Sequence, residues 1–230
     1  EDAQQKLCDA QVVHMKEKIA QQDEGEFDKN KLWILAELTK LRQICCSPSL
    51  CYENYRGEAT KLGGCRQLIQ SAMDGGHRML LFSHFTSMLA ILQDKLEKEG
   101  IPYYIITWET SKQKRQELVK QFNSDTTPVF LISLKAGGVG LNLTGADVVI
   151  HYDPWWNQAV QNQATDRAHR IGQENQVSVF KLITKHTIEE NILKLQEMRR
   201  DLADTVVTEG TGALSSITRE DLIRMLDEDI

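Results

Sequence analysis

Long apolar runs, an excess of basic residues and a regular cysteine framework are all missing from this sequence. No stretch reaches the roughly 18 consecutive apolar residues that a membrane-spanning helix requires. Residues 1–20 are polar with helical spacing and lack the apolar centre of a secretory signal. We therefore expect an intracellular protein without membrane contact, in the cytoplasm or nucleoid of a bacterium or the nucleus of a eukaryote.

The charge balance is acidic. With 27 lysines and arginines against 33 aspartates and glutamates, the 230-residue chain has a formal net charge of −6. A protein that binds nucleic acid through a broad basic surface usually has the opposite sign, so any contact with DNA must be a local groove or stripe. Hydrophobic residues at 41% and charged residues at 26% are typical of a globular chain and exclude wholesale disorder.

The five cysteines are an odd number without the spacing of a disulfide framework, so we expect reduced thiols. Cys45, Cys46 and Cys51 are close in sequence, but they form no CxxC pair, and no histidine follows at the spacing of a zinc site. The sequence favours small buried apolar side chains here and predicts no metal site.

The first 50 residues are predicted to be helical, because leucines and isoleucines recur at steps of three and four. This apolar face comprises Leu32, Ile34, Leu35, Leu38, Leu41 and Ile44. Pro48 ends the pattern, since the residue before a proline avoids helical angles. The polar, turn-rich segment 52–64 is interpreted as a hinge.

Beyond residue 62, short apolar runs alternate with amphipathic segments. The runs are Met79–Phe82, Tyr103–Ile106, Val129–Ile132, Val148–Ile150 and Val177–Ile183. Helices are predicted at Thr86–Glu99, Ser111–Phe122 and Asn157–Ile171, and capping signals at Thr187–Glu190 and Thr218–Asp221 begin two more. This order predicts an α/β fold, a parallel sheet flanked by helices, with ligands beyond the carboxyl ends of its strands.

Two segments carry chemistry. In Leu131–Asn142 a predicted strand runs into closely spaced glycines whose amides could approach an anion, although the spacing fits neither a Rossmann fingerprint nor a Walker A loop. The alternative there is a tight turn. In the second segment Gln163, Arg167 and Arg170 share one face of a predicted helix, and guanidinium groups match phosphate oxygens. The alternative is an amphipathic helix whose arginines pair with surface carboxylates.

Residues 133–173 closely resemble the C-terminal motor lobe of the SWI/SNF-type helicase-like ATPases, which translocate on double-stranded DNA. The fifth and sixth helicase motifs of that family are similar to SLKAGGVGLNLTGADVVIHYDPWWN and QATDRAHRIGQ. Its fourth motif, the segment after it and its helical protrusion resemble RMLLFSHFTSML, TSKQKRQELVKQFN and LRQICCSPSL. The match covers residues 31–204 and implies a RecA-like lobe, the second of two.

The resemblance also implies roles for single residues. In this family ATP with Mg²⁺ lies between the lobes and is bound mainly by the first, so the N-terminal RecA-like lobe and double-stranded DNA are the implied partners. The residues implied to reach the γ-phosphate are Gln163, Arg167 and Arg170, and those implied to sense the nucleotide are Gly138 and Gly140. The implied DNA-facing residues are Ser83, His84, Thr110, Ser133 and Lys135, and the implied coupling residues are Trp155 and Trp156.

Each of these roles has a structural alternative. Ser83 and Thr110 could cap helices, and Lys135 could be a solvated loop charge. The two tryptophans could be core or interface aromatics. Three departures from the family also count against parts of the assignment: Trp108 replaces a glycine, Gln158 a proline and Gln161 a glutamate. A bulky residue at position 108 strains the turn if its φ is positive.

The phosphate-cradling lysine loop and the acidic metal-holding motif of the first lobe are both missing. We therefore expect part of a larger ATPase that is inactive alone. Its expected divisions are a helical arm and hinge at 1–56, a RecA-like lobe at 57–205, and a linker with a tail helix at 206–230. The rival hypothesis is a non-catalytic interaction module that keeps the fold of the lobe. A small nucleotide-binding enzyme complete in itself would require a phosphate loop.

Overall fold

The apolar runs of the sequence form one parallel sheet in the computed structural model, which describes residues 2–21, 29–136, 141–155, 158–166, 168, 176–203 and 219–226. The strands in these ranges are β1 (Met79–Ser83), β2 (Tyr103–Ile106), β3 (Val129–Ser133), β4 (Val148–His151) and β5 (Ser178–Lys181). Their order is β2-β3-β1-β4-β5, and all pair in parallel. The three central strands are buried throughout, whereas the edge strands β2 and β5 are more exposed, which explains the continuous apolar runs of β1, β3 and β4.

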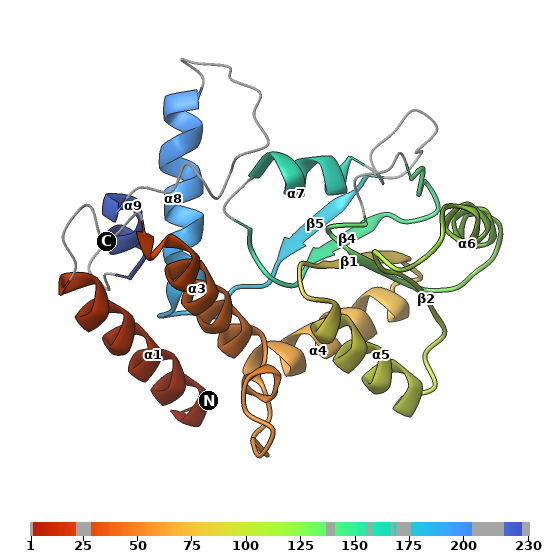
Figure 1. Ribbon diagram of the computed structural model, residues 1–230. Helices are drawn as coiled ribbons and strands as arrows, with labels where there is room; N and C mark the ends of the chain where they lie inside the picture. Colours follow the sequence, from red (N-terminus) through yellow and green to blue (C-terminus); the bar gives the residue numbers. More distant parts are fainter. Residues whose placement is uncertain are drawn as a thin grey trace. The chain divides into compact units, whose positions relative to one another are not determined.

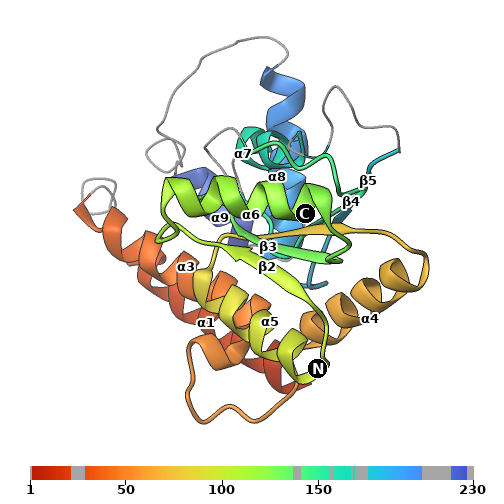
Figure 2. The same cartoon turned by 90° about the vertical axis from the view of Figure 1, so that its right-hand side faces the viewer.

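Helices cover both faces of this sheet. Figures 1 and 2 show α4 (Thr60–Asp74) and α5 (Thr86–Lys98) on one face, and α6 (Lys112–Ser124) and α7 (Gln158–Thr165) on the other. Such alternation follows from right-handed crossovers between parallel strands. The core under α6 and α7 includes Phe82, Phe122 and Phe130. The predicted α/β sheet with flanking helices is confirmed.

The remaining described helices are α1 (Asp2–Ala20), α3 (Lys31–Cys46), the short 3-10 helix η1 (Pro48–Leu50), α8 (Ile188–Ala203) and α9 (Arg219–Leu226). Helix α1 packs on α3, and α8 packs on α9. Helix α3 ends at Cys46, two residues before Pro48, as the sequence predicts. Leu38, Leu41 and Ile44 are buried, but the prediction is wrong for Leu32, whose side chain is 83% exposed.

The chain divides into two compact units. Residues 62–182 form one unit, called the lobe here, and residues 1–61 and 183–230 form the other, the helical unit. The chain therefore passes between the units twice, after Lys61 and after Leu182. We expected the lobe to extend from 57 to 205, but α8 groups with the helical unit because it packs on α3 and α9.

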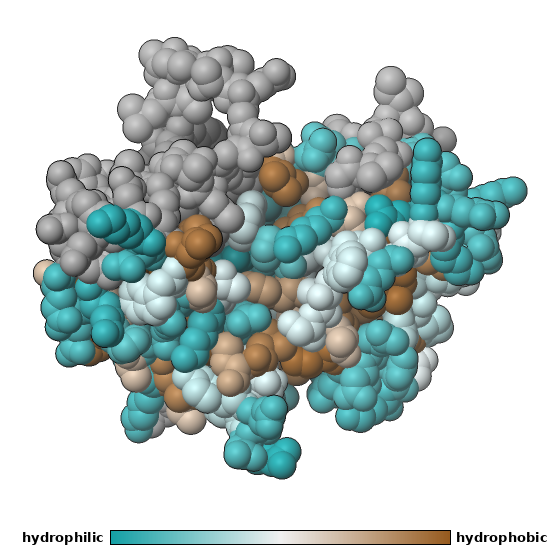
Figure 3. Space-filling view, in the orientation of Figure 1, coloured by the Kyte–Doolittle hydropathy of each residue, from teal (hydrophilic) through white to brown (hydrophobic). Residues whose placement is uncertain are grey.

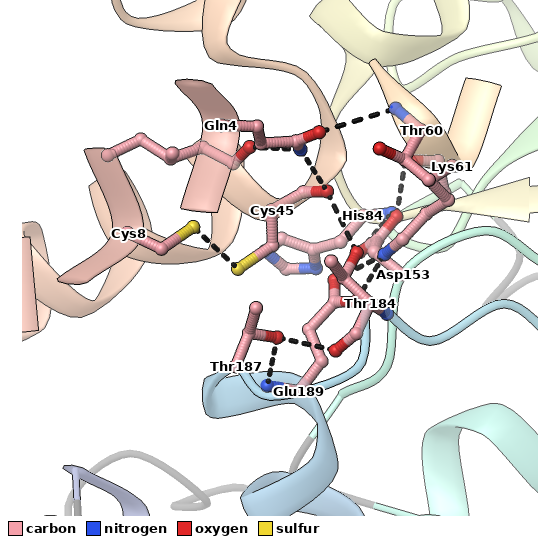
Figure 4. Close-up of polar contacts among 12 residues, drawn as sticks. Gln4, Cys8, Cys45, Thr60, Lys61, His84, Asp153, Thr184, Thr187 and Glu189 are labelled. Atoms are coloured by element: carbon pink, nitrogen blue, oxygen red, sulfur yellow. Dashed lines mark hydrogen bonds and ion pairs between the residues drawn. The ribbon is translucent and has the colours of Figure 1, made fainter. Parts of the chain in front are cut away.

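A set of polar contacts inside the helical unit holds the residues beside both passages, and we call it the crossing clamp: Gln4, Cys45, Thr60, Lys61, Thr184 and Glu189 (Figure 4). The buried Glu189 carboxylate accepts from Lys61 Nζ and from the Thr184 amide, the latter at 2.9 Å. Gln4 Nε2 donates to the Cys45 carbonyl at 3.1 Å, and Gln4 Oε1 accepts from the Thr60 amide at 3.3 Å. Burial lowers the pKa of Lys61, but the adjacent carboxylate outweighs it, so the net shift of this pKa is upward.

Membrane-spanning helices and metal-binding clusters are both absent from the described residues. None of their helices combines the length and hydropathy of a bilayer-spanning segment. Nor do three His, Cys, Asp or Glu side chains converge within these ranges as a metal site would require.

Cys8 and Cys45 bring their sulfur atoms to 3.8 Å in the buried contact between α1 and α3. The hydrogen bond with Cys8, together with burial, raises the pKa of the Cys45 thiol.

Candidate functional site

Polar residues follow three adjacent strands at the carboxyl edge of the lobe's sheet. Because β2, β3 and β1 are neighbours and all parallel, the segments after them begin at the same edge. Ser83 and Ser133, the last residues of β1 and β3, are paired in register, and Ile106 at the end of β2 is paired with Ile132. The topology thus brings the segments that carry the five predicted DNA-facing residues to one edge. Ligands of open parallel sheets collect at this edge.

Asp153 organises the end of β1. This buried carboxylate follows β4 and accepts from the Ser83 hydroxyl at 2.6 Å. It also accepts from the His84 amide, at 3.1 Å and 3.2 Å to its two oxygens (Figure 4). Ser83 Oγ in turn accepts from the Phe85 amide at 3.1 Å. Since hydrogen bonds to an ionised group are stronger than neutral ones, Asp153 fixes the backbone between β1 and α5.

The ring of His84 stacks on Trp155. The ring centroids are 4.0 Å apart and the planes differ by 17°. Asp153 accepts a hydrogen bond from the His84 amide and lies two residues before Trp155 in the sequence. The backbone segments that carry the two rings are therefore held together. Both rings are only partly buried. The stack joins a predicted DNA-facing residue to a predicted coupling residue, although Trp156, the second predicted coupling residue, lies outside the described residues.

A hydrogen-bonded turn follows β2. The Thr107 amide donates to Thr110 Oγ1 at 3.0 Å, and the Thr110 amide donates to the Thr107 carbonyl at 3.2 Å. His186 is the one non-glycine residue with a positive φ among the described residues, so Trp108 occupies the turn without that strain. The tryptophan side chain is 61% exposed. The backbone strain that a positive φ at Trp108 would have caused is therefore absent.

Arg115, on the first turns of α6, holds this loop from behind. Its guanidinium donates to the carbonyls of Thr110 at 2.8 Å, Trp108 at 3.1 Å and Thr107 at 3.2 Å. A planar fork can reach three carbonyls together, which a lysine ammonium on a flexible stem does less well. Arg115 therefore fixes the loop on which Thr110 and Trp108 lie.

The alternatives for the serine, threonine and lysine side chains can be compared with the observed caps. Residue Phe85 occupies the N-cap of α5 and Ser111 that of α6, where its side chain accepts from the Lys114 amide. Ser83 and Thr110 are thus not the caps of these helices. Ser133 Oγ is buried without a hydrogen-bond partner in the described part of the chain, and Lys135 is exposed.

The predicted phosphate-facing residues are described only in part. Gln163 is exposed on α7. Arg167, Arg170, Gly138 and Gly140 lie outside the described residues. The arginine face and the glycine loop therefore stay predictions.

His151 anchors α7 to the sheet. At the end of β4 its Nε2 lies 2.9 Å from Thr165 Oγ1, and that hydroxyl donates to the Gln161 carbonyl at 3.1 Å. Because the hydroxyl proton is used, Nε2 of the imidazole is the donor in this pair. Nδ1 is buried without a partner among the described residues, so a second ring proton would find no acceptor. Burial, with the nearby charge of Lys181, lowers the pKa of His151 to about 4.

Three residues of this region were missed from the sequence: Asp153, Arg115 and His151. Asp153 had a usable signal, since an aspartate shortly after an apolar strand run is placed at the carboxyl edge. Arg115 and His151 had none, because the shape of the turn whose carbonyls Arg115 contacts and the packing of Thr165 on His151 are seen only in the folded chain.

The comparisons with known proteins identify the family of the chain. Residues 60–172 match the helicase conserved C-terminal domain. An uncharacterized ATP-dependent helicase of Mycoplasma pneumoniae is 39% identical over 204 residues, which cover 87% of this chain and 19% of that protein. The chain thus spans about a fifth of the length of the curated relatives it matches first.

Two solved structures from Sulfolobus solfataricus are similar over nearly the whole chain. The SWI2/SNF2 ATPase C-terminal domain is 29% identical, with a TM-score of 0.78, and the match covers 100% of this chain and 95% of that one. The SWI2/SNF2 ATPase core in complex with dsDNA is 30% identical, with a TM-score of 0.77, and the match covers 97% of this chain and 47% of that one. The chain belongs to the SWI2/SNF2-type helicase-like ATPases, of which it is the C-terminal RecA-like lobe.

Proposed function

We propose that this chain is the second motor lobe of an ATP-dependent translocase on double-stranded DNA. The observation that carries the proposal is the arrangement of the sheet, in which three adjacent parallel strands begin the segments with the predicted DNA-facing residues at one edge. The likeness to an ATPase core in complex with dsDNA supports the same ligand. An intracellular site of action, at the nucleoid or in the nucleus, follows from that ligand.

The contacts with DNA are proposed to be contacts with its backbone. Lys135 is exposed and supplies a positive charge, while Thr110 and His84 lie on loops fixed by Arg115 and Asp153. Ser133 Oγ has a hydroxyl proton to donate and no partner among the described residues, but it is buried at the end of β3 and is not open to a ligand in this structure. Hydroxyl and ammonium donors at one edge suit phosphate oxygens and carry no base code. Such binding is independent of sequence, which suits movement along a duplex.

The contacts with the nucleotide are proposed for Gln163, Arg167 and Arg170, with Gly138 and Gly140 as the nucleotide-sensing loop. ATP with Mg²⁺, held mainly by the N-terminal RecA-like lobe, supplies the phosphoryl group whose charge these residues would neutralise. The amide of Gln163 is exposed on α7 and fits a phosphate oxygen. An arginine that stabilises a transferring phosphoryl group is worth about 10³–10⁵ in turnover.

Coupling is proposed to run through the tryptophans. Trp155 stacks on His84, and Asp153 bonds the His84 backbone, so the segment before α7 is tied to the end of β1. A displacement of that segment would therefore reach a DNA-facing residue directly. Trp156 is proposed to act with Trp155 in the same segment.

DNA-stimulated ATP turnover tests the proposal. It should be measured for the 230-residue chain and for the product of the complete reading frame, each with Arg167→Ala and Arg170→Ala. We expect almost no turnover from the chain alone, DNA-dependent turnover from the complete product, and a loss of about 10³-fold or more in both variants. Arg66→Ala on α4 is the control, because Arg66 is 57% exposed and pairs only with Glu99 among the described residues.

Two results would contradict the proposal. If the complete product does not hydrolyse ATP, the chain is the interaction module of the rival hypothesis. If the arginine variants turn over as fast as Arg66→Ala, the arginines belong to a solvated helix face and the proposed roles are wrong.

A further inference from the structure

Trp108 is a large aromatic side chain exposed where the proposed function places DNA. The large apolar side chains that are exposed in the described ranges are Val13, Leu32, Trp108, Val179, Phe180 and Ile223. All but Trp108 lie on helices of the helical unit or on the edge strand β5. Trp108 alone of these is on a loop at the carboxyl edge, two residues from Thr110. An exposed tryptophan offers both an apolar face and an N–H donor to a ligand.

The loop presents this side chain in a fixed position. Arg115 donates to the carbonyls of Thr107, Trp108 and Thr110. The turn is also closed by the hydrogen bond from the Thr107 amide to the Thr110 hydroxyl. No positive φ is required at Trp108. A preorganised loop loses little backbone entropy when it binds, so more of the contact energy appears as affinity.

The charges around the loop indicate what Trp108 contacts. Lys112 and Lys114 are exposed at the start of α6, and Figure 3 shows hydrophilic side chains gathered over the part of the lobe where α6 lies. Lys114 is paired with Glu117 at 3.0 Å. Glu109 is exposed directly beside Trp108 and repels phosphate. The tryptophan is therefore better matched to the sugars and base edges of a duplex than to its phosphates.

We propose that Trp108 is a direct DNA contact that packs its indole against sugar or base surface, a role that rests on the proposed function and adds to it. The proposal divides the edge into two kinds of contact. Lys135 binds through charge, which salt screens, whereas Trp108 binds through apolar area, which salt does not screen. This division is measurable because the two contacts respond differently to ionic strength.

The experiment measures the affinity of the chain for a short mixed-sequence DNA duplex as a function of salt. We expect Trp108→Ala to weaken binding by about 5- to 150-fold at every salt concentration, the range that loss of one aromatic contact gives. The slope of log affinity against log salt should stay that of the parent. Trp108→Phe should keep most of the affinity, and Lys135→Ala should lower the slope by about 0.9.

Tryptophan fluorescence gives a second readout on the same samples. Binding of the duplex should quench the parent and should quench Trp108→Phe less, even though that variant keeps Trp33, Trp155 and Trp156. Because the Trp108 side chain is exposed, its replacement should leave the urea unfolding midpoint unchanged, and this shows that the variants are folded.

The possible failures are distinguishable. If Lys135→Ala weakens binding and Trp108→Ala does not, the role of Trp108 is wrong and the proposed function stands. If Trp108→Ala lowers the salt slope as Lys135→Ala does, the change acts through loop charge and the packing role is wrong. If the parent itself does not bind the duplex, the proposed function fails, and the inference about Trp108 fails with it.

Discussion

Replacing Asp153 by asparagine keeps the shape of the side chain and removes its charge. In the parent this carboxylate accepts from the Ser83 hydroxyl at 2.6 Å and from the His84 amide at 3.1 Å. A hydrogen bond to an ionised group contributes about 1.5–3 kcal/mol. Asparagine can still accept from one donor, but its NH₂ group offers a proton to the other. We therefore expect Asp153→Asn to lower the free energy of unfolding by about 2–4 kcal/mol.

The assay is urea unfolding of the chain, followed by circular dichroism. Ser83→Ala removes one donor and should cost about 1–2 kcal/mol, while the double variant should cost less than the sum of the two. This non-additivity is the signature of the direct bond, because Ser83 and Asp153 lie 70 residues apart in sequence. Asp94→Asn is the matched control, since Asp94 is 64% exposed on α5 and should change stability by less than about 0.5 kcal/mol.

The reasoning is refuted if Asp153→Asn unfolds at the parent's urea concentration. It is also refuted if the two single changes add fully in the double variant. Either result would mean that the end of β1 is positioned by packing and that the carboxylate contributes nothing to it.

Three further predictions concern buried charge and loop order. Lys61→Met leaves the buried Glu189 carboxylate without its cation and should cost about 3–5 kcal/mol in urea unfolding. Adding Glu189→Gln to that variant should cost less than Glu189→Gln alone. The pKa of His151 is about 4 in the folded chain and 6.5 in the unfolded chain. As the pH falls, His151 therefore takes up its proton in the unfolded chain first, which favours unfolding. Between pH 6.5 and 4 the parent should lose about 3 kcal/mol of unfolding free energy that His151→Gln does not lose. Arg115→Lys should cost about 1–3 kcal/mol in urea unfolding, because the single nitrogen of lysine cannot take the positions of the two guanidinium nitrogens that contact the carbonyls.

Each of these has a control. The control for Lys61→Met is Lys98→Met, since Lys98 forms an exposed ion pair with Asp94. If both variants lose the same free energy of unfolding, burial of the Lys61–Glu189 pair does not matter and the prediction is wrong. For the pH dependence the control is His14→Gln, which removes an exposed imidazole and leaves His151 in place. If the two histidine variants have the same pH profile, His151 is not the titrating group. If Arg115→Lys is as stable as the parent, the loop is held by its own threonine bonds.

The sheet could be predicted because its strands carry their own signal. Continuous apolar runs such as Val129–Ile132 are needed wherever both faces of a strand are covered, and the helices between them alternate with the runs. The edge at which ligands gather then follows from parallel pairing alone, so the segments with Ser83, Thr110 and Lys135 could be placed together. Leu32 shows the limit, because its periodicity fits the apolar face but it lies at the first turn of α3 and is exposed.

The contacts within the site could not be predicted in the same way. Asp153 bonds the end of β1 because β4 is the neighbour of β1, and strand order is not written in a single sequence. The pKa of His151 depends on its burial and on the nearby charge of Lys181, and both are set by the folded structure. The grouping of α8 with the first 61 residues depends on which helix faces meet, not on the order of the elements along the chain.

The double passage of the chain between its units has a consequence for synthesis. Domains generally fold as they emerge from the ribosome, amino-terminal parts first. The helical unit cannot do so, because Glu189 and Thr184, which complete the crossing clamp, are made only after the whole of 62–182. All five described strands of the lobe are synthesised before α8, so its sheet can form before α8 is present to pack on α3. A nascent chain that has emerged from the ribosome only as far as residue 182 would therefore hold a folded lobe, while the apolar faces of α1 and α3 are not yet covered by α8 and are prone to aggregate.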